Sequence, residues 1–186
     1  MGKKVALLGD SIRLFGYGRL VPDLLRGKAE VFQPQENCRF AKYTLRGIYD
    51  WADELKTCEV IHFNCGLWDA SRIVGDGRLF SSDEEYVDNI LRIATALGKF
   101  TPNVIFATTT PVHPLYADDR NEDIDRFNAL VVPALRALGV RINDLHSLVA
   151  ADVEGNICED RIHLSQQGAE RCAAQVAKVI GEYLNA

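Results

Sequence analysis

Short apolar runs recur five times along the chain, and segments with helical periodicity separate them. The runs are four to seven residues long and are bounded by turn-forming or polar residues. Runs of this kind are typical of strands that are covered on both faces of a sheet. The sequence therefore predicts strands at residues 4–8, 29–33, 59–64, 103–109 and 140–143.

Apolar residues between and after these runs recur at intervals of three or four, which is the spacing of one face of a helix. Such stripes run through residues 45–55, 86–97, 124–138 and 169–184. Gly98 and Gly139 follow two of the stripes directly, where a glycine commonly ends a helix. We expect each stripe to pack into the core of the protein.

Strands that alternate with helices predict an α/β fold in which a parallel sheet is covered on both faces and the crossovers are right-handed. The 186 residues show no repeat, low-complexity tract or linker, so we expect a single domain over residues 1–186. In such sheets, ligands bind beyond the carboxyl ends of the strands. The residues that follow each predicted strand are therefore the candidates for chemistry.

The balance of charged residues limits the classes of molecule that the protein is expected to bind. The chain has 21 Lys and Arg against 26 Asp and Glu, a formal net charge of −5, and no basic stripe, which argues against nucleic-acid binding. No apolar run approaches the roughly 18 residues of a membrane span. The apolar segment after Lys4 is also too short for the core of a signal peptide. We expect a cytoplasmic protein with no membrane or nucleic-acid partner.

The cysteines support the same compartment. There are five of them, an odd number, and no Cys-x-x-Cys pair. This usage favours reduced, packed thiols. No two Cys or His positions have the spacing of zinc ligands, so we expect no metal. Cys65 stays open as an alternative nucleophile.

Asp160 and His163 stand three residues apart, just before the last helical stripe. A histidine acts as the general base for a serine when an acceptor on its Nδ1 holds it in one tautomer. A carboxylate three residues earlier can fold back within one turn to make that bond. The alternative is a loop aspartate and a surface histidine before a helix that Ser165 caps.

Ser11 follows the first predicted strand and the turn at Gly9. Its hydroxyl is expected at the carboxyl edge of the sheet. Backbone N–H groups at the start of the following helix can stabilise an oxyanion there. The alternative is that Asp10 or Ser11 is simply the cap of that helix.

Together, these segments resemble the SGNH, or GDSL-type, hydrolase superfamily. Gly9-Asp10-Ser11-Ile12 matches its first block near the N-terminus, and Asp160-Arg161-Ile162-His163 matches its last block near the C-terminus. Asn143-Asp144-Leu145 also looks like the segment before the last block. The order and separation of the blocks make the resemblance specific, although each block alone is short.

The resemblance implies a three-layer α/β/α, flavodoxin-like sandwich with five parallel strands in the order 2-1-3-4-5. It implies a serine esterase that needs no cofactor, with Ser11 as nucleophile, His163 as general base and Asp160 as the residue that orients it. Acyl transfer would pass through an acyl-enzyme that water later releases.

The third block departs from the family pattern Gly-x-Asn-Asp, because Trp68 stands where the oxyanion-binding asparagine is expected. A tryptophan is no amide donor, although its indole N–H can donate. Asn64 lies two residues before Gly66 at the end of the same predicted strand. We expect its amide to reach the cavity, as in a variant branch with an Asn-x-Gly-Leu-(Trp/His)-Asp block. The alternative is that Asn64 satisfies a buried backbone group.

The second block normally offers a glycine N–H, and Arg39 stands near that position here. A backbone N–H can come from any residue except proline, so we expect the oxyanion hole to consist of Ser11, Arg39 and Asn64. These residues follow three strands that are adjacent in the order 2-1-3. The Arg39 side chain either favours acidic or polar substrates or is simply solvated, and Asn37 is a candidate helix cap.

Three other residues are expected to contact the substrate: Asp10, Trp68 and His113. The two long crossovers at residues 70–82 and 111–123 are expected to overhang the carboxyl edge of the sheet and line the pocket. His62 is expected in the core, and His146 in a structural role.

The sequence thus predicts an esterase or deacetylase for small, acetyl-like esters of a polar alcohol, with carbohydrate as one candidate and a small-molecule ester as its partner. A thioesterase or lysophospholipase of the same superfamily is the alternative within this class. Outside it stand a catalytically weak binding protein on the same fold, and a flavodoxin-like binder of phosphate or a cofactor at the Gly9–Ser11 turn.

Overall fold

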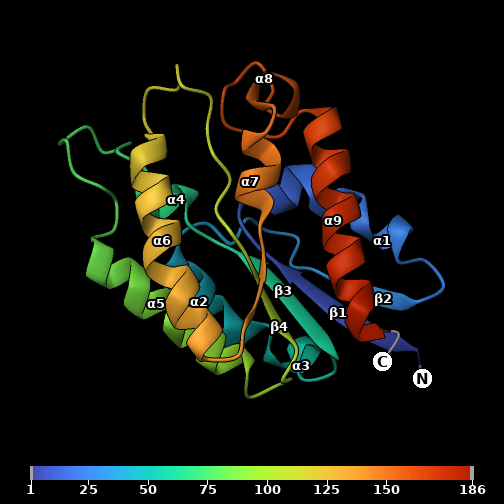
Figure 1. The fold of residues 1–186 in the computed structure, drawn as a ribbon. Coiled ribbons are helices and arrows are strands. Elements are labelled where there is room, and N and C mark those ends of the chain that lie inside the picture. The colour runs from blue at the N-terminus through green and yellow to red at the C-terminus, as the bar shows by residue number, and fades with distance from the viewer. Residues whose placement is uncertain (1, 185–186) are drawn as a thin grey trace.

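A five-stranded parallel sheet with helices on both faces forms the centre of the protein in a computed structural model that describes residues 2–184 (Figure 1). The strand order is β2-β1-β3-β4-β5, and every neighbouring pair is parallel. Both the α/β class and the order 2-1-3-4-5 are therefore confirmed. The strands are β1 (Lys3–Leu8), β2 (Ala29–Phe32), β3 (Val60–Asn64), β4 (Val104–Ala107) and β5 (Arg141–Asn143).

The register of the sheet brings the carboxyl ends of β1 and β3 together. Leu8 of β1 pairs with Phe63 of β3, and Asn64 pairs with Ala107 of β4. β3 and β4 are buried along their whole length, which explains their continuous apolar sequence. The residues that follow β1 and β3 consequently emerge side by side at the carboxyl edge.

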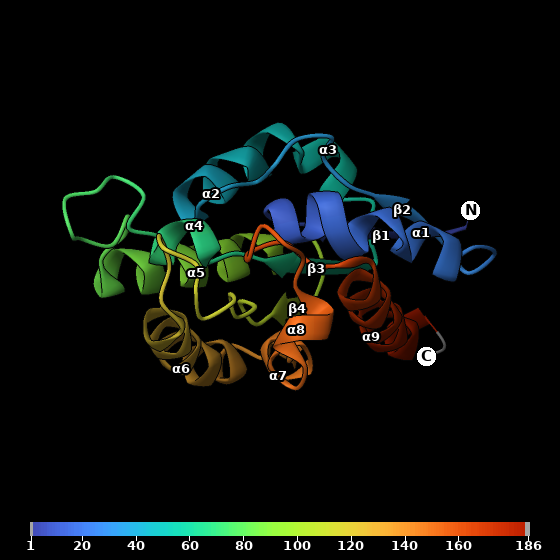
Figure 2. The same cartoon turned by 90° about the horizontal axis from the view of Figure 1, so that it is seen from above.

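Helices pack against the sheet in two sets. One set is formed by α2, α5 and α6, and the other by α1, α7, α8 and α9. Seen from above, α2 and α9 lie on opposite sides of the strands (Figure 2). The helical elements are η1 (Ile12–Gly16), η2 (Tyr17–Arg19), α1 (Val21–Leu24), α2 (Ala41–Asp50), α3 (Ala52–Leu55), α4 (Leu67–Ala70), α5 (Asp83–Leu97), α6 (Asn121–Ala137), α7 (Leu145–Ala150), α8 (Val153–Asn156) and α9 (Gln166–Leu184).

The predicted helix ends are confirmed at both glycines. Gly98 is the C-cap of α5, and Gly139 follows α6 with a positive φ of 80°. The stripe at residues 45–55 does not form one helix, because α2 ends before Trp51 and α3 begins after it. The Trp51 ring occupies the space beside Gly47, where a β-carbon would lie 2.3 Å from the ring.

The segment after β1 is less regular than a simple helix. It forms a π-helical turn, η1, then a 3₁₀ turn, η2, and only then α1. Arg13 in η1 is fully buried, and its guanidinium donates to the carbonyls of Gly9 (3.1 Å), Pro34 (2.9 Å) and Glu36 (2.7 Å). Arg13 thereby fixes the segment after β2 against the end of β1.

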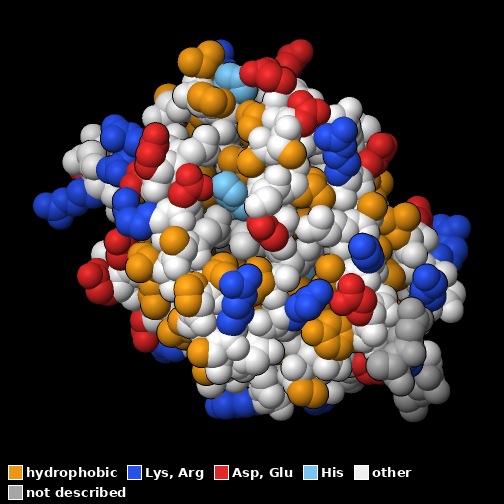
Figure 3. Space-filling model, in the orientation of Figure 1, with side chains coloured by type: hydrophobic (Ala, Val, Ile, Leu, Met, Phe, Trp, Pro, Cys, Tyr) orange, Lys and Arg blue, Asp and Glu red, His pale blue; other side chains and the backbone are white. Residues whose placement is uncertain are grey.

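Acidic and basic side chains alternate over the face seen in Figure 3, with no continuous basic patch on that face. Among the described residues, no helix has the length and apolar character needed to cross a bilayer.

Candidate active site

A cavity of about 270 Å³ opens beyond the carboxyl ends of β1 and β3. Ser11 and His163, which are 152 positions apart in the sequence, both line it. Its remaining walls are mostly apolar, with a few polar side chains. They comprise Phe15, Asn37, Leu67, Trp68, Ser71, Ile73, Tyr116, Asp119 and Ile162.

Ser11 lies between the end of β1 and η1, where the chain turns out of the sheet. Its backbone is right-handed helical (φ −62°, ψ −26°) and its side chain is buried at the base of the cavity. The β-carbon of any other residue at Gly9 would lie 2.0 Å from Asn64 Oδ1. The turn that presents Ser11 therefore requires glycine at that position.

His163 and Asp160 form the contact that the sequence predicts. His163 Nδ1 lies 2.7 Å from Asp160 Oδ2. The other oxygen, Oδ1, accepts the backbone N–H groups of Ile162 (3.0 Å) and His163 (2.9 Å). One carboxylate thus orients the ring and organises the turn that carries it.

Burial alone would raise the pKa of Asp160. Hydrogen bonds from the N–H groups of His163 and Ile162 and from the His163 ring outweigh this effect and hold the pKa below its ordinary value. Asp160 is therefore a carboxylate, the form that a neutral or protonated imidazole needs as its partner. The Phe15 and His163 rings pack in a T-shaped arrangement, with their centres 6.0 Å apart.

Within residues 2–184, Ser11 Oγ and His163 Nε2 have no hydrogen-bond partner. Catalytic hydrogen bonds often tighten only when substrate binds. The structure thus brings Ser11 and His163 to the same cavity and places Asp160 against the His163 ring.

Asn64 lies in a buried chain of polar groups. Its Nδ2 donates to Asp10 Oδ1 at 2.8 Å, and its Oδ1 accepts the Tyr17 hydroxyl at 2.6 Å. Asn64 is not among the residues that line the cavity. In this arrangement one amide hydrogen is engaged with Asp10, and only the second can reach an oxyanion.

Arg39 also differs from the expected arrangement. Its backbone has a left-handed φ of 50°, which suits the glycine position of the family pattern. Its N–H, however, donates to Asn37 Oδ1 at 2.7 Å. Asn37 lines the cavity, and fixing its oxygen orients its amide group. The sequence predicted Asn37 only as a candidate helix cap. The hydrogen bond between its Oδ1 and the Arg39 N–H is seen only in the structure.

Asp69, the last residue of the third block, is an anchor. Its carboxylate accepts the Ala41 N–H at the start of α2 (2.9 Å) and the Ser81 hydroxyl (2.7 Å). Desolvation raises the pKa of Asp69 to about 6. Asp69 joins the turn after β3 to α2 and to the loop before α5.

Two residues expected to contact substrate have other positions. Asp10 is buried beneath the cavity, where it accepts from Ile12 N–H and Asn64, and desolvation raises its pKa to about 6. His113 does not line the cavity, because its Nε2 pairs with Glu154 at 3.0 Å. Neither Asp10 nor His113 lines the cavity, whereas Trp68 does line it and is partly exposed.

The two long crossovers meet over the site. Ser71 and Ile73 from one and Tyr116 and Asp119 from the other line the cavity. The Arg72 N–H donates to the Asp118 carbonyl at 2.8 Å and so joins the two loops directly.

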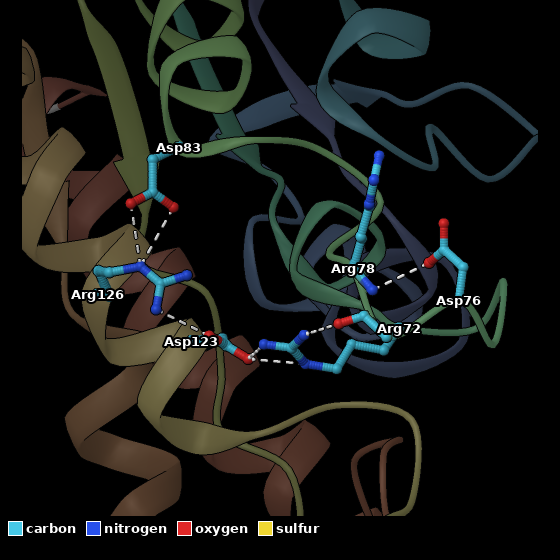
Figure 4. A network of polar contacts seen from close by, with 7 residues as sticks. Arg72, Asp76, Arg78, Asp83, Asp123 and Arg126 are labelled. Carbon is cyan, nitrogen blue, oxygen red and sulfur yellow. Dashed lines mark hydrogen bonds and ion pairs between the residues drawn. The ribbon is translucent and has the colours of Figure 1, made fainter.

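Salt bridges hold this arrangement (Figure 4). The Arg72 guanidinium donates to Asp123 Oδ2 at 2.6 Å, and Arg126 Nη1 donates to Asp123 Oδ1 at 2.8 Å. Arg126 also pairs with Asp83 at the start of α5. Because Asp123 is buried, this network anchors the first loop to α5 and α6 more firmly than a surface pair would.

Cys65 is buried outside the cavity, and desolvation raises the pKa of its thiol well above the ordinary value. This environment does not suit a thiolate nucleophile. His62 lies in the core, as expected, with its Nε2 3.1 Å from Asn143 Nδ2, and desolvation lowers its pKa to about 3.

Several solved structures with a similar fold are described as lipases, acylhydrolases or esterases. A lipase/acylhydrolase from Enterococcus faecalis aligns with a TM-score of 0.80 at 17% identity, over 97% of this chain and 96% of that one. A GDSL-like lipase from Bacteroides thetaiotaomicron aligns at 0.75 and 16%, over 97% and 88%. An acetylxylan esterase from Geobacillus stearothermophilus aligns at 0.78 and 15%, over 97% and 96%.

No family model matches the sequence, and no curated protein matches it either. The likeness confirms that the chain has the fold of the SGNH, or GDSL-type, hydrolases. At these identities the likeness shows a shared fold.

Proposed function

We propose that this protein is a serine hydrolase of small carboxylic esters that works through an acyl-enzyme on Ser11. The observation that carries the proposal is the 2.7 Å contact of His163 with Asp160 at a cavity that Ser11 also lines. The fold shared with lipases, acylhydrolases and esterases supports it.

In the first half-reaction, His163 Nε2 takes the proton of Ser11 Oγ as the oxygen attacks the carbonyl carbon of the ester. Collapse of the tetrahedral intermediate breaks the bond to the alcohol oxygen, and the protonated His163 returns the proton to the departing alcohol. Water then attacks the acyl-enzyme with the same base, which releases the acid and restores Ser11. Asp160 remains ionised and stabilises the imidazolium that forms in each half.

The oxyanion needs hydrogen-bond donors placed where its charge develops. The proposed donors are the Ser11 N–H and one side-chain amide. The sequence predicts that Asn64 supplies that amide, and with one amide hydrogen bound to Asp10 only its second hydrogen is available. Asn37 is a second candidate because it lines the cavity while its oxygen is fixed by the Arg39 N–H. For Arg39 to donate as well, its bond to Asn37 would have to open.

The size of the cavity favours a small acyl group. Its volume of about 270 Å³ is just below the roughly 300–1,000 Å³ of sites for drug-sized ligands. Trp68, Ile73 and Ile162 give it apolar walls suited to a short acyl chain. We therefore favour acetyl-like esters over the long-chain substrates of a lysophospholipase.

The test is the hydrolysis of p-nitrophenyl acetate, butyrate and octanoate by the protein and by its Ser11→Ala, His163→Ala and Asp160→Asn variants. We expect turnover to be highest with the acetate. Ser11→Ala and His163→Ala should each lower it by several orders of magnitude, and the double variant should lose little more. Near-native turnover in folded Ser11→Ala protein would refute the proposal. A folded but inactive parent protein would favour a binding function.

A further inference from the structure

Asp119 is a buried carboxylate in the cavity that the proposed mechanism does not use. It lies in the loop between β4 and α6, and the residue is 4% exposed. It lines the same cavity as Ser11 and His163. Within residues 2–184, neither of its carboxylate oxygens has a hydrogen-bond partner.

No positive charge near Asp119 neutralises its carboxylate in the described residues. The charged groups that shift its pKa are Asp118 and Asp123, and both are acidic. The guanidinium groups of Arg72 and Arg126 form salt bridges with Asp123. Ser71 lies close enough to Asp119 to offset part of the rise in pKa that burial causes. Its hydroxyl does not, however, meet the geometry of a hydrogen bond to either carboxylate oxygen.

A buried carboxylate without partners is costly, and proteins seldom retain one unless something binds it. Desolvation raises the pKa of Asp119 to about 6, so above that pH the group is a charged acceptor in the wall of the cavity. Both oxygens are covered in this structure, so a donor on a molecule in the cavity reaches them only when a side chain of the wall moves.

We propose that Asp119 determines specificity by accepting a hydrogen bond from a hydroxyl group on the alcohol part of the ester. The proposal rests on the ester hydrolase function argued above. Ser71 and Tyr116 line the cavity with Asp119, and a hydroxyl group can act both as donor and as acceptor. This mixed set suits the hydroxyl groups of a polyol or sugar better than a cation, which needs acceptors only.

The experiment compares kcat/KM for three acetates: glycerol 1-monoacetate, propyl acetate, which lacks hydroxyl groups, and acetylcholine, which carries a charge but no donor. The variants are Asp119→Asn and Asp119→Ala, with Asp118→Asn as the matched control. We expect the parent protein to prefer glycerol monoacetate. Both Asp119 variants should lose roughly 10- to 100-fold of that preference, the range for one hydrogen bond to a charged group. In the Asp119 variants, kcat/KM for propyl acetate should change less than about threefold. The control variant Asp118→Asn should show the same kcat/KM values as the parent.

An unchanged ratio of glycerol monoacetate to propyl acetate in Asp119→Ala would overturn the proposal. So would a loss confined to acetylcholine, which would assign Asp119 to a cation instead.

If the parent protein hydrolyses none of the three esters, the ester hydrolase function is refuted separately. Binding then tests Asp119 directly, by ligand-observed NMR with glycerol and 1-propanol. Contrast between these alcohols that disappears in Asp119→Asn would support hydroxyl recognition, and no contrast in the parent would overturn it.

Discussion

Replacing Asp119 by asparagine should stabilise the protein at alkaline pH, because it removes the charge of a buried carboxylate that has no partner in the described residues. The pKa of this group rises from 3.8 to about 6 on folding. Each pKa unit corresponds to about 1.36 kcal/mol, so the ionised group costs the folded state about 3 kcal/mol. The new amide would also lack partners, at a cost of about 1 kcal/mol or more. We expect a net gain of about 1–2 kcal/mol.

The sign of the pH dependence follows from the direction of the shift. Because the folded-state pKa lies above the unfolded one, the native protein keeps a proton that the unfolded chain loses between pH 3.8 and about 6. Stability therefore falls as pH rises through that window, and the penalty is complete above it. Asp119→Asn should show its gain at pH 8 and lose it at pH 4. Asp10 and Asp69 have similarly raised pKa values, but they are present in both proteins and cancel in the difference.

Urea unfolding followed by circular dichroism at pH 8 and pH 4 measures this difference. At pH 8 the melting temperature should also rise by about 2–8 °C, given about 2–4 °C per kcal/mol for a domain of this size. Equal stability of the two proteins at pH 8, or the same gain at both pH values, would refute the reasoning. Asp118→Asn is the control and should change stability by less than about 0.5 kcal/mol.

Three further results are expected. Alanine at the amide that serves the oxyanion, Asn64 or Asn37, should lower turnover roughly 10²–10³-fold with KM within a few-fold, and no tenfold loss in either variant would exclude both. Gly66→Ala should unfold the protein or strongly destabilise it in a urea titration, since its β-carbon would lie 2.1 Å from Thr109 Oγ1; native stability would contradict the packing. The ratio of kcat/KM for glycerol monoacetate to propyl acetate should fall as pH drops through about 6, where Asp119 gains a proton; a ratio constant from pH 5 to 8 would contradict this.

The sequence predicted the sheet because the sheet is encoded locally. Each expected strand overlaps an observed one within a few residues, and the glycines at 98 and 139 end their helices where expected. The strand order came from the family resemblance, and the register then placed the end of β1 beside that of β3. These features depend on periodicity and turn residues, which a sequence displays directly.

Other features depended on tertiary burial and could not be predicted. Nothing in the pattern distinguishes Arg13, a buried cation bound to three carbonyls, from an exposed arginine on a helix. Asp119 stands in an acidic loop that looks solvated, and only the folding of two crossovers over the site buries it. Likewise, the hydrogen bond from the Arg39 N–H to Asn37 depends on a left-handed turn. The turn contains no glycine, so the sequence gives no sign of it.

The central claim, that Ser11 is a nucleophile activated by His163, is tested most directly by covalent labelling. The protein is incubated with a fluorophosphonate, and intact-mass and peptide mass spectrometry then locate the adduct. We predict one adduct, on Ser11, that forms together with the loss of p-nitrophenyl acetate hydrolysis, is absent in Ser11→Ala and is strongly slowed in His163→Ala. Ser147→Ala, which alters an exposed serine, should label like the parent. Labelling that persists in folded Ser11→Ala protein, or a folded parent that takes no label, would contradict the account.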